Sequence, residues 1–216
     1  QGRDCVDTIA QRLSLAGLGR SDTDRSAAGV YDVLIVGAGP AGISASLRAI
    51  ETKLNYITIE RDEIGGTVAK YPRQKLVMTS PFEFPMYGKF KKLELSKENL
   101  LSFWNTILQR ADFKPHTNES VEDIRKDQED IFTIATQKAQ YRARAVVLAL
   151  GRTGTPRKLG VKGEDLPKVM YRLIEADHYI GKKILVVGGG DSAIEAAMGL
   201  AQQQGNTVTL SYRKES

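Results

Sequence analysis

The stretch Tyr31-Asp-Val-Leu-Ile-Val-Gly-Ala-Gly-Pro-Ala-Gly42 decides the fold. Residues 31–36 are short, apolar and rich in β-branched side chains, which predicts a strand buried on both faces of a sheet. A GxGxxG turn follows, and residues 43–50 read as a helix. A second strand over 56–60 completes a strand–helix–strand unit of about 30 residues.

Each glycine of this turn has a mechanical role in binding a dinucleotide. Gly37 allows the tight turn, Gly39 lets the backbone approach a diphosphate, and Gly42 lets helix and strand pack closely. The diphosphate would bind free amides at the helix N-terminus, where the helix dipole favours negative charge. The acid expected about 20 residues further on is Glu60, which can accept hydrogen bonds from both ribose hydroxyls.

A second glycine feature follows the acid. Arg61 comes directly after Glu60, and Gly65-Gly66-Thr67 follows a few residues later. A close glycine pair lets backbone approach a flat ring system, because glycine has no Cβ atom. A plain surface turn is the alternative that the local sequence leaves open.

The opening pattern returns about 150 residues later in the chain. Residues 183–187 predict a strand, Gly188-Gly-Gly-Asp-Ser-Ala193 forms the GxGxxA variant of the turn, 194–203 predict a helix and 207–212 a strand. This repetition predicts an α/β protein with two dinucleotide-binding units.

The second unit ends in basic residues, Tyr212-Arg213-Lys214, where the first has an acid. Arg213 and Lys214 would pair with a 2′-phosphate, whereas a carboxylate there would repel it, so NADPH is favoured over NADH. Exposed cations at a strand end are the alternative. Glu195, one turn into the helix, is predicted to face either the nicotinamide or solvent.

The segment between the two units carries further predicted elements. Residues 65–95 are irregular and contain three prolines, and Ser96 caps a helix whose apolar positions keep 3.6-residue spacing. A β-meander and a final apolar strand that runs into Gly151 are predicted over 120–125, 130–136, 140–144 and 145–150.

Composition excludes several classes of protein. No apolar run approaches the ~20 residues that span a bilayer, and residues 1–20 lack the apolar core of a signal peptide. The net charge of +5 comes from scattered cations, which argues against nucleic-acid binding. One local cluster contains Lys89, Lys91, Lys92 and Lys97, and reads as a solvated face, with a docking patch for an acidic protein as the alternative.

Cys5 is the single cysteine, so these residues hold no disulfide, CxxC pair or four-cysteine iron–sulfur site. A reducing cytoplasm is therefore the default expectation.

The paired units resemble the two-dinucleotide-binding flavoproteins, and most closely the low-molecular-weight thioredoxin reductase group. The resemblance implies a Rossmann-like FAD-binding domain over 30–152 and a Rossmann-like NAD(P)H-binding domain over 153–216, with hydride passing from NADPH to flavin. It also implies that the first domain lacks its C-terminal segment and that the second is incomplete. Residues 1–29 are predicted to be a linker or the remnant of an upstream module.

The resemblance also implies which residues bind the cofactors. FAD would be bound by Gly37, Gly39, Pro40, Ala41, Gly42, Glu60, Arg61, Gly65, Gly66, Thr67, Val121, which would contact adenine, and Gly151. The nucleotide would be bound by Gly188, Gly190, Asp191, Ser192, Ala193, Glu195, Tyr212, Arg213 and Lys214. No catalytic side chain and no metal ligand is expected, because the cofactors carry the chemistry.

Two departures narrow the function. Thioredoxin reductases have a CxxC before the second glycine turn, but 169–175 contains no cysteine, and Ala41 stands where bacillithiol-disulfide-reductase-like relatives have one. What remains resembles the ferredoxin–NADP reductases of this group, which implies a redox acceptor protein or a fused module of ferredoxin or iron–sulfur type. A disulfide reductase with its cysteines elsewhere and a non-enzymatic flavin- or nucleotide-sensing module are the alternatives. The oligomeric state stays open, with a homodimer among the alternatives.

Overall fold

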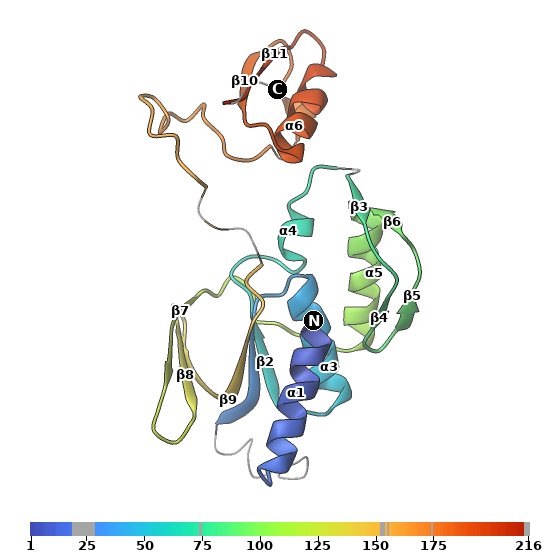
Figure 1. The fold of residues 1–216 in the computed structure, drawn as a ribbon, viewed down its shortest axis with the longest axis vertical. Coiled ribbons are helices and arrows are strands. Elements are labelled where there is room, and N and C mark those ends of the chain that lie inside the picture. Colours follow the sequence, from blue (N-terminus) through green and yellow to red (C-terminus); the bar gives the residue numbers. More distant parts are fainter. Residues whose placement is uncertain (19–28, 74, 152–153, 155, 174, 214–216) are drawn as a thin grey trace. The chain divides into compact units, whose positions relative to one another are not determined.

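The computed structural model describes residues 1–18, 29–73, 75–151, 154, 156–173 and 175–213 (Figure 1). The chain divides into two compact units, Gln1–Gly154 and Thr155–Ser216. Within the described ranges, no helix is both long and apolar enough to cross a bilayer.

The first unit is built on one five-stranded sheet with the order β2-β1-β9-β8-β7. The strands are β1 (Val30–Val36), β2 (Tyr56–Ile59), β7 (Val121–Lys126), β8 (Phe132–Thr136) and β9 (Gln140–Leu148). β2, β1 and β9 run parallel, whereas β9, β8 and β7 form an antiparallel meander. The predicted parallel sheet with a meander is confirmed.

One strand assignment was wrong. The sequence predicts separate strands over 140–144 and 145–150, but the chain runs through both in the single strand β9. β8 pairs with the first part of β9, and β1 pairs with β9 over a longer span, from Arg142 to Leu148. One long strand thus joins the meander to the parallel sheet.

β1 is buried on both faces, as its composition predicts. Val33 and Ile35 pack on one side of the sheet, in a cluster that includes Ala45. Leu34 and Val36 pack on the other side, in a cluster that includes residues of the meander. The glycine turn therefore starts from a rigid strand at the centre of the sheet.

α3 (Pro40–Glu51) follows the turn and begins three residues earlier than predicted. Gly39 adopts an extended conformation at the N-cap, and Pro40, whose φ angle suits a first helical residue, starts the helix. The Ser46 hydroxyl bonds the Thr58 hydroxyl at 2.8 Å, which ties α3 to β2.

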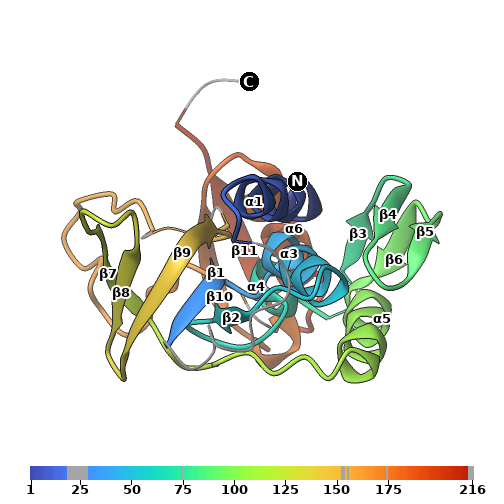
Figure 2. The same ribbon diagram turned by 90° about the horizontal axis from the view of Figure 1, so that it is seen from below.

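Residues 2–15 form helix α1 (Gly2–Leu15) within the first unit, where the sequence predicts a linker or a remnant. α1 lies beside α3 on the same side of the sheet (Figure 2). Val6 is fully buried in the cluster that contains Ala45 and Ala49 of α3. Alanine at these positions lets two helices approach closely, so a weakly apolar helix finds a partner that its own sequence does not reveal.

The predicted irregular stretch contains regular structure. It forms α4 (Gly66–Ala69) and the short strands β3 (Leu76–Met78), β4 (Phe82–Phe84), β5 (Gly88–Phe90) and β6 (Glu94–Ser96). β3 pairs with β6 and β4 with β5, both antiparallel. Strands of three residues are too short for a clear alternating pattern, which explains the missed prediction.

α5 (Lys97–Arg110) is the helix predicted after Ser96. The Ser96 hydroxyl accepts a hydrogen bond from the Asn99 amide at 3.2 Å, so the predicted cap is confirmed. Trp104 is buried in a cluster with Phe84 and Phe90 of the hairpin and Leu47 of α3. α5 thus attaches the short strands to the helical face of the unit.

The second unit contains a strand–helix–strand motif. It comprises β10 (Lys183–Val187), α6 (Asp191–Ala201) and the parallel strand β11 (Thr207–Ser211), preceded by a single helical turn at Ala176–His178. α6 begins at Asp191, three residues before the predicted start, because the turn leads directly into the helix. The Asn206 side chain donates to the carbonyls of Tyr179 and Leu200 at 2.6 and 2.8 Å, which joins helix and strand.

Candidate functional site

The first glycine turn is closed by contacts that leave no room for side chains. Gly37 has a φ angle of +106°, and a Cβ atom there would overlap the carbonyl oxygen of Ala149 at the end of β9. A Cβ atom at Gly42 would overlap the carbonyl oxygen of Gly37. Both glycines are therefore required by the fold of the turn itself.

Gly39 is different, because its free side faces the second glycine feature. A Cβ atom on Gly39 would lie 3.9 Å from the Cα atom of Gly66. Gly65 has a φ angle of +104° and its amide donates to the carbonyl of Ala38 at 2.8 Å. The two glycine segments thus lie face to face, which their distance in the sequence does not reveal.

Glu60 connects the end of β2 to the glycine turn. Its carboxylate is buried and accepts hydrogen bonds from the Ala38 amide at 2.6 Å and the Asp62 amide at 2.8 Å. Each carboxylate oxygen has two lone pairs, so both can still accept from a ribose hydroxyl. Glu60 is therefore a structural part of the turn as well as a candidate ligand for ribose.

The N-terminus of α3 is capped by a residue without a side chain. Among the described residues, no side chain caps this helix at Gly39. The first helical hydrogen bond runs from the Ile43 amide to the Gly39 carbonyl at 2.8 Å. The amides of Ala41 and Gly42 precede this bond, so they are positioned to bind an anion.

A cavity of about 780 Å³ lies in front of this turn. Its lining includes most of the predicted FAD-binding residues: Gly37, Gly39, Pro40, Ala41, Glu60, Arg61, Gly66, Thr67, Val121 and Gly151. Gly42 and Gly65 are absent from this lining, because Gly42 packs against Gly37 and Gly65 lies near Leu101 and Ala69. The structure thus brings residues from five separate stretches to one cavity.

Sequence reasoning missed Glu119, which also lines the cavity. It reaches the site because the chain before β7 runs beside β2, where Ile59 bridges to His116. Its buried carboxylate accepts from the hydroxyls of Thr136 at 2.6 Å and Tyr141 at 2.9 Å. No local motif marks this residue, since its place depends on a crossing of distant segments.

These contacts set the ionisation of the pair. Burial alone would raise the pKa of Glu119, but hydrogen bonds from Thr136 and Tyr141 outweigh it and hold that pKa below its ordinary value. Burial and the neighbouring Glu119 raise the pKa of Tyr141 to about 12. Tyr141 stays protonated at neutral pH and holds Glu119 as an anion at the cavity wall.

The second turn has a similar design. Gly188 has a φ angle of +145°, and its amide donates to the Ser211 carbonyl at 2.9 Å. A Cβ atom on Gly188 would lie 3.0 Å from that of Ala193, whose small side chain fits closely. Gly190 caps α6 without a side chain and has no atom within 4 Å of the Cβ position.

The remaining predicted residues of the second unit surround this turn. The amides of Asp191 and Ser192 precede the bonds from Ala193 and Ile194 to the Gly190 carbonyl, at 2.9 and 3.1 Å. Asp191 lies in the first turn of α6, where the helix dipole favours an acid. Glu195 is exposed one turn further on.

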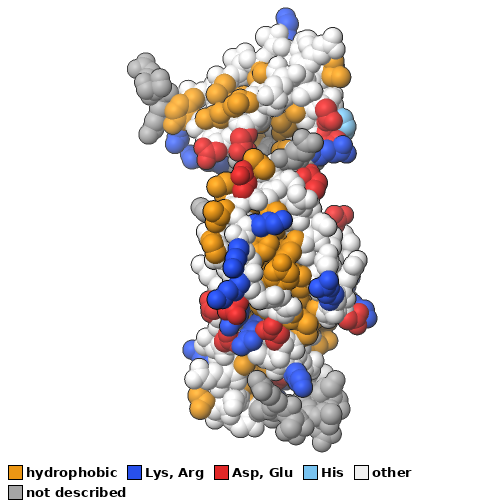
Figure 3. Space-filling view, turned by 90° about the vertical axis from the view of Figure 1, so that its right-hand side faces the viewer, with side chains coloured by type: hydrophobic (Ala, Val, Ile, Leu, Met, Phe, Trp, Pro, Cys, Tyr) orange, Lys and Arg blue, Asp and Glu red, His pale blue; other side chains and the backbone are white. Residues whose placement is uncertain are grey.

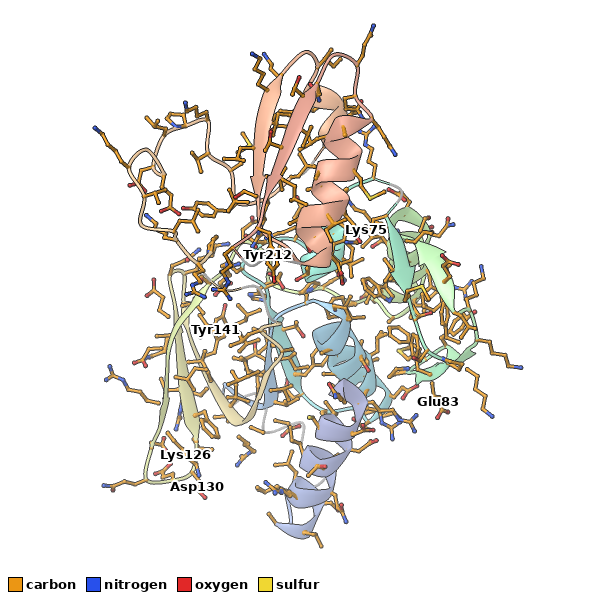
Figure 4. All side chains as sticks on the ribbon, turned by 45° about the horizontal axis from the view of Figure 1, so that its top comes forward. Lys75, Glu83, Lys126, Asp130, Tyr141 and Tyr212 are labelled. Carbon is orange, nitrogen blue, oxygen red and sulfur yellow. The ribbon has the colours of Figure 1, made fainter. Side chains whose placement is uncertain are left out.

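Tyr212 packs over the second turn from the end of β11. A Cβ atom on Gly189 would overlap its ring, so only glycine fits beneath the ring. Figure 4 shows Tyr212 at the end of the two strands. Arg213 follows it and is exposed, and Lys214 lies outside the described residues.

Comparison with known proteins identifies relatives of the chain. Residues 34–216 match the family described as pyridine nucleotide-disulphide oxidoreductase. A ferredoxin–NADP reductase of Streptococcus thermophilus is 34% identical over 193 residues, which cover 87% of this chain and 55% of the relative. The bacilliredoxin reductase of Bacillus subtilis is 29% identical over 183 residues, covering 83% of this chain and 56% of the relative.

Solved structures agree with this assignment. The bacillithiol disulfide reductase of Staphylococcus aureus superimposes with a TM-score of 0.76 at 27% identity, covering 86% of this chain and 58% of that protein. The chain thus spans just over half the length of these relatives. The resemblance to the low-molecular-weight thioredoxin reductase group is confirmed, and the chain belongs to the pyridine nucleotide-disulphide oxidoreductase family of NAD(P)H-dependent flavoproteins.

Proposed function

We propose that the protein containing this chain takes hydride from NADPH onto FAD and passes electrons to a protein or a fused redox module of ferredoxin or iron–sulfur type. The observation that carries this proposal is the pair of glycine-capped helices, α3 and α6, each at the end of a parallel strand. FAD is assigned to the first unit, over 30–152, and NADPH to the second, over 153–216.

The first cavity fits FAD in size and chemistry. Its volume of about 780 Å³ lies within the range of about 300–1,000 Å³ that is usual for ligand pockets. The amides of Ala41 and Gly42 would bind the diphosphate, and the Glu60 carboxylate would accept hydrogen bonds from the ribose hydroxyls. Gly39 and Gly66 give backbone surfaces that a flat ligand can approach without meeting side chains.

The cavity wall also favours unphosphorylated ribose. Glu60 and Glu119 both place buried carboxylates on the lining. A phosphate group on the ribose would face these anions at close range, which is strongly unfavourable in a partly dry site. This supports FAD, rather than NADPH, as the occupant of the first unit.

The second turn supports NADPH. The amides of Asp191 and Ser192 at the start of α6 would bind its diphosphate, and Arg213, just past the end of β11, would pair with the 2′-phosphate. When bound, FAD would accept hydride from NADPH and pass single electrons onward. Overall, NADPH and two oxidised one-electron acceptors give NADP⁺, a proton and two reduced acceptors.

A redox protein is favoured as acceptor by the composition of the chain and by a relative. The chain has one cysteine, Cys5, which is exposed on α1, so these residues hold no cysteine pair. The Streptococcus thermophilus relative is named a ferredoxin–NADP reductase. The relatives named for bacilliredoxin and bacillithiol disulfide favour disulfide reduction as the second candidate, which would require cysteines outside this segment.

The experiment that tests the proposal is anaerobic titration of the full-length, FAD-loaded protein with NADPH and with NADH. We expect NADPH to bleach the flavin absorbance band at lower concentration than NADH. Arg213→Ala should weaken NADPH by about 10- to 100-fold and leave NADH unchanged, because it removes a charge-assisted pair. Lys183→Ala, an exposed cation at the opposite end of β10, is the matched control.

Failure would take two forms. Bound FAD that neither nucleotide bleaches would contradict the oxidoreductase assignment. Equal weakening of both nucleotides by Arg213→Ala would contradict the phosphate role and leave the reaction class intact.

A further inference from the structure

One segment of the first unit is locally basic. Residues 70–98 contain seven Lys and Arg and three Glu, a net charge of +4 out of the +5 of the whole chain. This segment comprises β3, β4, β5 and β6. It includes the local lysine cluster noted in the sequence, Lys89, Lys91, Lys92 and Lys97.

The cations of this segment differ in their availability. Lys97 is half-buried and donates to the Tyr71 carbonyl at 2.6 Å. Lys91 and Lys92 are exposed, and no carboxylate in the described part of the chain pairs with either. Lys89 lies opposite Glu83 across the β4–β5 pair, but Glu83 also receives the Arg3 guanidinium at 2.7 Å.

Apolar side chains are exposed beside these lysines. Leu76 and Met78 alternate with the inward-facing Val77 along β3, and Met78 is 76% exposed. Leu93 is exposed just before β6. The outer residues of a solvated strand are usually polar, so exposed apolar residues at alternate positions mark an interaction surface.

We define the hairpin surface as Leu76, Met78, Lys89, Lys91, Lys92 and Leu93. Figure 3 looks onto the side of the molecule where these strands lie and shows lysine and arginine side chains beside hydrophobic ones. In Figure 4, Lys75 and Glu83 mark positions near β3 and within β4 of the same region.

A short segment connects the hairpin surface to the FAD cavity. It runs from Thr67 and Lys70, which line the cavity, to β3, which begins at Leu76. α4 contacts α5, and α5 contacts β3 and β6. A partner bound to these strands would therefore lie near the part of the cavity lined by Gly66 and Thr67, where the glycine pair could let a flat ring approach the backbone.

We propose that the hairpin surface is the docking site for an acidic protein that carries an exposed one-electron centre of iron–sulfur type. The inference rests on the proposed function and names its partner surface. Each docking event transfers one electron, so two partner molecules are reduced for each NADPH oxidised. Basic charge would speed the encounter with an acidic partner, and the apolar residues would form the small contact that suits a transient complex.

The test uses the full-length, FAD-loaded protein, with an acidic plant-type [2Fe–2S] ferredoxin and uncharged menadione as alternative acceptors. The variant is Lys91→Glu with Lys92→Glu. The matched control is Lys182→Glu with Lys183→Glu, the other adjacent exposed lysine pair, which changes the net charge equally. Ferredoxin reduction is followed at several ionic strengths, and binding of the oxidised ferredoxin by calorimetry.

We expect the Lys91/Lys92 variant to raise the KM for ferredoxin roughly tenfold at low salt and to flatten its salt dependence. Menadione rates should stay at the wild-type level, and the control variant should behave like wild type with both acceptors. Ferredoxin kinetics unchanged in the Lys91/Lys92 variant, or an equal loss in the control, would overturn the inference. So would a wild-type protein that reduces menadione but neither binds nor reduces the ferredoxin.

The failure of the proposed function would look different. A wild-type protein that reduces neither acceptor with NADPH would contradict the oxidoreductase proposal itself, whatever the charge variants do.

Discussion

Glu60 has a structural role in the fold beside its proposed role in binding ribose. Its two carboxylate oxygens accept hydrogen bonds from the amides of Ala38 and Asp62. The sequence predicts the ribose role from the spacing of an acid after the glycine turn. It does not predict these amide contacts, because they depend on how the turn closes against the end of β2.

Glu60→Gln should weaken FAD binding by about 10- to 100-fold. The new side-chain NH₂ group would face a backbone amide that now donates to the carboxylate, and a buried donor left without an acceptor costs about 1–3 kcal/mol. The side chain keeps its size, so the effect isolates the hydrogen bonds. The dissociation constant for FAD, measured by flavin fluorescence in the full-length protein, checks this. Glu63→Gln, at an exposed acid nearby, is the control, and equal FAD affinity in both variants would contradict the role of Glu60.

At the scale of elements, α1 extends the fold beyond the region that matches the family. The family match begins at residue 34, whereas α1 ends at Leu15. Val6 and an ion pair between Asp7 and Arg48, at 2.6 Å, hold it against α3. Because α3 begins at the first glycine turn, α1 supports the helix whose N-terminus is proposed to bind the diphosphate.

Val6→Asp should lower the stability of the first unit by on the order of 3 kcal/mol, because it buries a charge without a partner. Leu15→Asp lies on the same helix at a side chain that is 82% exposed, and should have little effect. Thermal unfolding, monitored through the release of flavin, distinguishes the Val6→Asp variant from the Leu15→Asp variant. Identical unfolding of the two variants would show that α1 does not pack as described.

Within the second unit, the loop before β10 is organised by Glu164. Its carboxylate accepts from the amides of Leu159 and Gly160, both at 2.7 Å, and from the Tyr171 hydroxyl at 2.9 Å. The bond from Leu159 is the main cause that holds the pKa of Glu164 below its ordinary value, despite the opposing effect of burial. The sequence shows only a Gly- and Lys-rich connection here, since a loop held by one carboxylate has no periodicity.

The pKa of Glu164 is lower in the folded state than in the unfolded state, so its carboxylate stabilises the loop at any pH above the unfolded pKa. This contribution is lost as the pH falls through the folded pKa. We therefore expect hydrogen-exchange protection of the Leu159 and Gly160 amides to fall on acidification below about pH 4.5. Glu164→Gln should show weak protection at every pH. A wild-type loop whose protection does not change with pH would contradict this account.

At the scale of the whole molecule, local patterns predicted the repeated units well. The strands and glycine turns of both units, and the helix capped by Ser96, depend on neighbours in sequence. The contacts that complete the first cavity depend on distant segments instead. The approach of Gly66 to Gly39 and the delivery of Glu119 by a crossing beside β2 have no local signal.

The central claim is that the two glycine-capped helices bind two different cofactors. Gly39 and Gly190 allow a matched test, because both are N-caps with φ angles of −78° and −91° that alanine can adopt. An added Cβ atom would lie 3.9 Å from Gly66 in the first case and would meet nothing within 4 Å in the second. Alanine at either position should cost the fold only about 1 kcal/mol.

The measurement is FAD content and NADPH-driven flavin bleaching in full-length Gly39→Ala and Gly190→Ala. We predict that Gly39→Ala loses FAD while the protein stays folded, because the methyl group stands where the diphosphate must approach. Gly190→Ala should keep FAD and lose bleaching by NADPH. Normal FAD content in Gly39→Ala together with normal bleaching in Gly190→Ala would contradict the account.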